Sequence, residues 1–161
     1  MPNTLRCSCL LTCEHASNAV PRHLQPLFSK QENLLRTHRG YDIGGKEYAQ
    51  AIASSTGWPL FCGSYTRLLV DLNRSTRVFP AFLKELDPRT KTQILKTYYQ
   101  PFRAKVFKFV CDRIATGGCV IHLSCHTFTP VLNGVVRPMD LGLLYDPSRD
   151  REKEIAEAVA H

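Results

Sequence analysis

The sequence predicts an α/β domain of three layers, with a mainly parallel β-sheet between two layers of helices. Short apolar segments alternate along the chain with longer amphipathic ones, which is typical of parallel strands joined by helical crossovers. Polar residues follow several of these apolar segments, where ligands bind in such folds. The 161 residues are 43% apolar and 22% charged, enough to bury a core without a disulfide or metal. We therefore expect residues 1–161 to form one domain.

The first half of the chain holds three predicted strands and one helix. Residues 5–12 are small, apolar and β-compatible, so we expect a buried strand there. Asp42 is a suitable N-cap for a helix that ends at Gly57. Two short strands are expected at residues 59–62 and 66–70.

The second half begins with a long predicted helix. Asp87 and Pro88 are typical of an N-cap and first turn, and the apolar stripe continues to residue 115. Pro101 is expected to kink this helix. Two further strands, separated by a loop, are expected at residues 119–124 and 141–145. A final helix is expected after them, with Ser148 as its N-cap.

Composition restricts the class of protein. The longest early apolar run, residues 7–13, is far shorter than the roughly 20 residues of a membrane span, and no signal-peptide pattern is visible. We expect a cytoplasmic protein without a membrane partner. Most of the seven cysteines lie in apolar runs, so we predict reduced thiols, with a metal site at Cys7, Cys9 and Cys13 as the alternative.

The net charge of +7 is concentrated in the middle of the chain. Residues 61–120 hold 11 basic and 4 acidic side chains. A basic nucleic-acid-binding module is therefore one hypothesis. We favour a solvated helix face, because this stretch lacks Gly-aromatic signatures and lies mostly on one predicted helix. No nucleic-acid partner is expected.

Several polar residues at predicted strand ends can carry chemistry. His15 and His126 follow two different strands, so their imidazoles can meet at one edge of the sheet. With Asp42 or Glu14 supplying an oxygen, they have the ligand types of a catalytic zinc site. The alternatives are structural, with Asp42 as the helix N-cap and the histidines hydrogen-bonded at strand ends.

A second group consists of arginines, whose planar guanidinium binds carboxylates through two bonds. They are Arg67, Arg74, Arg77 and Arg137. Arg74 and Arg137 lie next to the candidate metal ligands and suit an anionic substrate. The chain contains no G-x-S-x-G elbow, no P-loop and no G-x-G-x-x-G turn, which argues against serine hydrolases, nucleotide hydrolysis and nicotinamide chemistry.

Five blocks in one order resemble the N-formylglutamate amidohydrolase family. They are TCEHAS (12–17), HRGYDIG (38–44), RLLVDLNR (67–74), CHTFTP (125–130) and DLGLLYD (140–146). The resemblance implies a zinc-exopeptidase-like α/β/α sandwich. It also implies hydrolysis of the formamide of N-formyl-L-glutamate, or of a similar N-acyl acidic amino acid, to formate and glutamate, a last step of histidine degradation.

The resemblance also implies roles for individual residues. His15 and His126 are expected to bind Zn²⁺ with a carboxylate as the third ligand. We prefer Asp42 for this position, with Glu14 polarising the water, although the two can exchange roles. Arg74, Arg137 and Asn73 are expected to hold the two carboxylates of the substrate, a small dicarboxylate.

Members of this family are longer, and their later part holds a glutamate that resembles a general base. We therefore expect the chain to be truncated at its C-terminus and slow as an enzyme. The alternative is a catalytically impaired remnant that binds a metal or an anion. The oligomeric state is not predicted.

Overall fold

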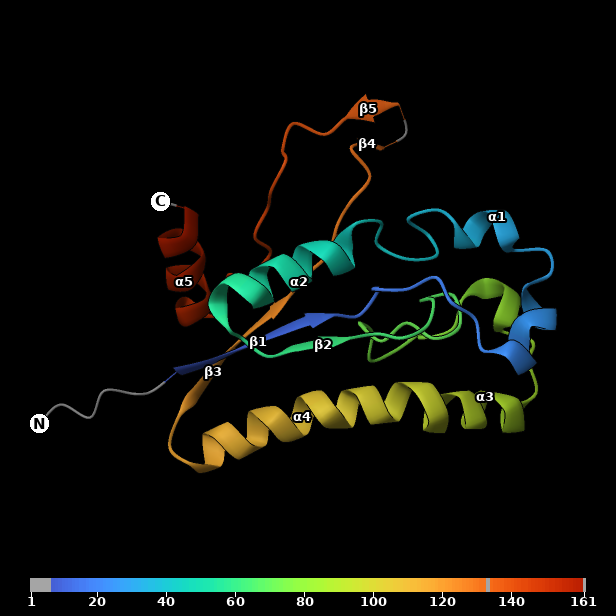
Figure 1. The fold of residues 1–161 in the computed structure, drawn as a ribbon, viewed down its shortest axis with the longest axis horizontal. Coiled ribbons are helices and arrows are strands. Elements are labelled where there is room, and N and C mark those ends of the chain that lie inside the picture. The colour runs from blue at the N-terminus through green and yellow to red at the C-terminus, as the bar shows by residue number, and fades with distance from the viewer. Residues whose placement is uncertain (1–6, 133, 161) are drawn as a thin grey trace, which may run out of the picture. The chain divides into compact units, whose positions relative to one another are not determined.

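The computed structural model describes residues 7–132 and 134–160, which form two compact units (Figure 1). The first unit extends to Phe128, and the second runs from Thr129 to the C-terminus. The prediction of a single domain stays a prediction. Among the described residues, no helix combines the length and the apolar character needed to cross a membrane.

The first unit is built around a three-stranded parallel sheet. Strand β1 (Cys7–Cys13) lies between β2 (Leu60–Cys62) and β3 (Cys119–Ser124), in the order β2-β1-β3. These strands confirm three of the predicted apolar segments, although residues 5 and 6 of the first lie outside the described residues. Because all three strands run in the same direction, their carboxyl ends meet at one edge.

Helices cover both faces of this sheet. Helix α2 (Gly45–Thr56) packs on one face, where Ala49 contacts the apolar cluster that includes Leu11. Helix α4 (Gln100–Ala115) lies along the other face (Figure 1), with the Phe61 and Phe109 rings 5.9 Å apart. Alternate residues of a strand therefore point toward opposite faces of the sheet and pack against different helices. The result is a mixed α/β fold with a small parallel sheet flanked by helices.

Helix α2 begins later than predicted. Its N-cap is Gly44, with a φ of 77°, and it ends at Gly57, with a φ of 71°, as predicted. Asp42 is therefore not the N-cap. The left-handed conformation at Gly44 redirects the chain before the helix starts, and the Asp42 side chain is left for other contacts.

Residues 66–70 form a buried turn, so the strand predicted there is wrong. The Thr66 hydroxyl donates to the Gly40 carbonyl and accepts the Leu68 amide. Leu69 is fully buried in a second apolar cluster, beside the long helix. The apolar composition of this segment therefore reflects its burial. Its backbone forms a turn and does not pair with a neighbouring strand.

The long helix is interrupted just before Pro101. Helix α3 (Pro88–Ile94) starts at the predicted N-cap Asp87 and passes through a π-helical turn (Leu95–Tyr99) into α4. Pro101 has no N–H to offer the preceding turn, which explains an irregularity at this point. The predicted kink is therefore a widened turn.

The second unit differs from its prediction in two places. A short antiparallel hairpin, β4 (Val131–Leu132) and β5 (Val135–Val136), lies where a loop was predicted. Residues 141–145 are irregular, so the strand predicted there is wrong. Their side chains are exposed and pair with no described strand. Helix α5 (Asp150–Ala160) follows close to the predicted Ser148.

The remaining elements of the first unit are short helices, namely Arg22–Phe28, α1 (Glu32–Leu35) and Ala81–Leu83. Cys7 and Cys119 are opposite each other in the register and form a disulfide, so the prediction of reduced thiols is wrong for this pair. This pairing also removes Cys7 from the alternative cysteine metal site. Cys13 stays a free thiol, and its burial raises its pKa to about 12.

Candidate metal centre

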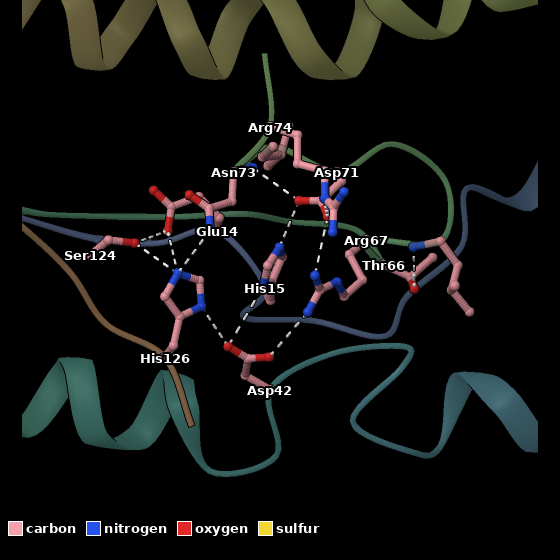
Figure 2. A network of polar contacts seen from close by, with 12 residues as sticks. Glu14, His15, Asp42, Thr66, Arg67, Asp71, Asn73, Arg74, Ser124 and His126 are labelled. Carbon is pink, nitrogen blue, oxygen red and sulfur yellow. Dashed lines mark hydrogen bonds and ion pairs between the residues drawn. The ribbon is translucent and has the colours of Figure 1, made fainter. Parts of the chain in front are cut away.

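The candidate site lies at the carboxyl edge of the sheet, where β1 and β3 end, and Figure 2 shows its side chains at close range. His15 follows β1, Asp42 precedes α2 and His126 follows β3. His15 is 1% exposed and Asp42 4% exposed, while His126 is half-buried. One ligand atom from each lies within 4.8 Å of the others, and this is the group of described residues that can hold a metal ion. The structure thus brings together the residues that the sequence singled out.

The His15 ring has one nitrogen paired and the other unpaired. Nε2 lies 2.8 Å from Asp71 Oδ1, and the ring N–H donates to this carboxylate. Nδ1 is buried, has no hydrogen-bond partner and lies 3.6 Å from Asp42 Oδ2. In a neutral imidazole protonated at Nε2, Nδ1 carries a lone pair. A buried nitrogen lone pair of this kind suits a metal ligand.

Asp42 is held as an anion between the two histidines. Its Oδ2 lies 2.7 Å from His126 Nδ1, and Arg67 Nη1 is 3.7 Å from Oδ1. Burial alone would raise the pKa of Asp42, but the hydrogen bond from His126 and the neighbouring His15 imidazole lower it well below its usual range. Burial would also lower the pKa of His15, yet Asp42 and Asp71 outweigh this effect and raise it.

Glu14 lies beside the three candidate ligands. Its carboxylate is buried, and the Ser124 hydroxyl donates to Oε2 at 2.6 Å. His126 Nε2 lies 2.9 Å from Ser124 Oγ and 3.7 Å from Glu14 Oε2. A carboxylate next to an imidazole of the cluster can exchange protons with a molecule bound there. Its role as base stays a prediction.

The backbone of Glu14 is packed tightly against Gly63. The Gly63 amide donates to the Cys13 carbonyl at 2.8 Å, just beyond the end of β2. A Cβ at position 63 would lie 2.1 Å from the Glu14 carbonyl oxygen. Since that atom belongs to the backbone, any side chain at this position displaces the strand end that carries Glu14 and His15.

We expect Gly63→Ala to lower the free energy of unfolding by about 1–3 kcal/mol, because it overpacks the strand end. Urea unfolding measures this change. Gly142→Ala is the control, since its Cβ would meet only Met139 Sδ, at 3.7 Å. Equal stability of the two variants would contradict the tight packing.

Two residues near the centre, Asp71 and Ser124, were given no role from the sequence. Asp71 accepts from His15, from the Arg67 guanidinium and from the Arg74 guanidinium, and Ser124 joins Glu14 to His126. The signal for Asp71 was present, since it heads the polar run at residues 71–74. Burial alone would raise the pKa of Asp71, but His15 and Arg67 lower it to about 2.

Two of the predicted substrate residues, Arg74 and Asn73, lie beside the cluster. Arg74 is next to the cluster, with its side chain 57% exposed, and the Tyr99 hydroxyl donates to its carbonyl at 2.7 Å. Asn73 Nδ2 lies 3.3 Å from His126 Nε2. Arg137 belongs to the second unit, where its amide donates to the Pro130 carbonyl. Substrate binding by all three stays a prediction.

The sequence matches the model of the N-formylglutamate amidohydrolase family over residues 7–161. The chain belongs to this family. The fold is also similar to the crystal structure of gene product Atu2144 from Agrobacterium tumefaciens, with a TM-score of 0.82 and 27% identity. That alignment covers 96% of this chain and 66% of the other, so this chain spans just under two thirds of the solved protein. A search of curated proteins finds no significant match.

Family membership confirms the resemblance read from the sequence. An amidohydrolase activity on a small-molecule substrate is proposed on this basis below. The site adds two buried residues, His15 and Asp42, and the half-buried His126, which together can bind a metal ion.

Proposed function

We propose that the chain hydrolyses the N-acyl amide of N-formyl-L-glutamate, or of a similar N-acyl acidic amino acid, with Zn²⁺ held by His15, Asp42 and His126. The products are formate and glutamate. The observation that carries this proposal is the unpaired Nδ1 of His15, buried beside an ionised carboxylate and a second imidazole. The cytoplasmic location and the place in histidine degradation stay predictions.

The donor set fits zinc better than a hard cation. Two imidazoles and one carboxylate are a common ligand set of catalytic zinc, whereas Mg²⁺ and Ca²⁺ prefer oxygen ligands. This is also the chemistry expected of the zinc-exopeptidase-like fold proposed from the sequence. When bound, the ion supplies Lewis-acid polarisation of the amide carbonyl and acidifies a water molecule.

The side chains around the centre supply the remaining functions. The water oxygen bonds to the acyl carbon while Glu14 accepts a proton of this water at its carboxylate. Glu14 then returns the proton to the leaving nitrogen as the C–N bond breaks, which gives formate and the free amine. Arg74 binds a substrate carboxylate through its terminal amino groups, which contact no acceptor among the described residues. Asn73 offers an additional amide donor, and Arg137 is proposed for the second carboxylate.

Formate release from N-formylglutamate tests the proposed function. We expect turnover by the zinc-loaded protein, loss of turnover with a chelator and recovery on adding Zn²⁺. Zinc binding without any formate release would identify the impaired remnant instead. A protein that shows no zinc binding and no turnover would overturn the proposal.

We expect Arg74→Ala to weaken substrate binding by about 1.5–3 kcal/mol, because it removes a charge-assisted contact with the substrate. The KM for N-formylglutamate measures this loss. Arg77→Ala is the matched control on the same loop, and an equal KM in the two variants would remove Arg74 from substrate recognition.

A further inference from the structure

Asp71 has every acceptor position filled. His15 Nε2 and the backbone amide of Asn73 donate to Oδ1, at 2.8 and 3.1 Å. Arg67 Nη2 and Arg74 Nε donate to Oδ2, at 3.1 and 3.2 Å. A carboxylate has about four lone-pair sites. Asp71 therefore has none left for a metal ion or for a substrate proton.

The two oxygens of Asp71 serve two different parts of the site. Through Oδ1 it keeps the proton of His15 on Nε2, which turns Nδ1 toward Asp42 (Figure 2). A carboxylate behind a metal-binding histidine fixes the tautomer and the ring orientation. Asp71 thus acts on the metal only through His15.

Through Oδ2 it holds the inner nitrogen of the Arg74 side chain. The contact uses Nε, and the terminal amino groups make no hydrogen bond with the described residues. The Arg74 side chain is more than half exposed, and nothing else among the described residues fixes its guanidinium. Arg67 contrasts with it, since its guanidinium contacts both Asp42 and Asp71.

We infer that Asp71 is a positioning residue that couples metal binding to recognition of the substrate carboxylate. One side chain fixes both His15 and Arg74, so its loss weakens both functions together. This inference rests on the proposed function, because it takes Arg74 as the carboxylate-binding group and His15 as a metal ligand.

Asp71→Asn tests the inference, since asparagine keeps the shape and loses the charge. On the full chain, zinc affinity is measured by competition with a chromophoric chelator. Binding of glutarate, a simple dicarboxylate, is then measured by calorimetry at saturating Zn²⁺. We expect zinc affinity to fall about 10–100-fold and glutarate affinity to fall about tenfold or more. The control is Asp112→Asn, an exposed carboxylate paired with Lys108 on α4, which should change neither.

Arg74→Ala separates the two effects. It should reduce glutarate affinity while leaving zinc affinity within about twofold, and adding Asp71→Asn to it should cost little further glutarate affinity, because both act through one guanidinium. Full additivity, or a loss of zinc affinity with normal glutarate binding in Asp71→Asn, would overturn the coupling.

A second measurement, the protonation state of the His15 ring nitrogens, uses the wild-type protein and does not depend on whether a variant folds. With ¹⁵N-labelled histidine, we expect the zinc-loaded protein to show His15 protonated at Nε2, and protonation at Nδ1 would overturn the inference. The proposed function fails separately: if the wild type binds Zn²⁺ and glutarate but releases no formate, the coupling stands and the proposed reaction falls. If the wild type binds neither, both fall.

Discussion

His15→Ala and His126→Ala should each leave the purified protein with far less than one equivalent of zinc. Each variant removes one of the three atoms that meet within 4.8 Å, and two ligands hold the ion much more weakly than three. Metal analysis after purification without chelator measures this directly. Circular dichroism checks that the fold is kept, which we expect above all for His126, since it is only half-buried.

His23→Ala is the matched control, because that histidine is exposed and is not one of the three candidate ligands. It should keep the zinc content of the wild type. Stoichiometric zinc in both His15→Ala and His126→Ala would show that the ion binds elsewhere.

Glu14→Gln should reduce kcat for N-formylglutamate by about 10²- to 10⁴-fold, the usual contribution of a positioned acid and base. Glutamine keeps the size of the side chain, and its amide can still pair with the Ser124 hydroxyl, so the local packing is preserved. Zinc content should stay at the wild-type level if Asp42 is the carboxylate ligand. Steady-state formate release and metal analysis on one preparation measure both quantities.

Glu47→Gln, an exposed change on the first turn of α2, is the control and should leave kcat unchanged. If Glu14→Gln instead loses its zinc, Glu14 and Asp42 exchange the roles proposed for them. Undiminished turnover of Glu14→Gln with full zinc content would show that a group other than Glu14 transfers the proton.

The sheet could be predicted because its strands are short apolar runs followed by polar residues. β1 and β3 fit this pattern, and Gly57 ends α2 through its left-handed conformation. Residues 66–70 look the same in composition, but the Thr66 hydroxyl fixes a turn there. A single sequence reports burial, whereas the backbone partner of a buried segment is decided by tertiary contacts.

The candidate site was also partly predictable. His15 and His126 follow predicted strands, and parallel strands bring their ends together. Asp71 was passed over because its function depends on four donors that converge only in the folded chain. Asp42 was open to two interpretations, and the choice between them depended on the conformation of Gly44, which composition does not report.

The pairing of β1 with β3 affects the order of events during folding. Glu14 and Ser124, which hydrogen-bond across this pair, are 110 residues apart in the sequence. Closing so long a loop is entropically costly, and contacts of this range slow folding. On the ribosome, β1 and β2 can associate as soon as residue 62 has left the exit tunnel, whereas β3 and His126 arrive much later. During synthesis, the proposed set of metal ligands is therefore complete only after most of the first unit has left the ribosome.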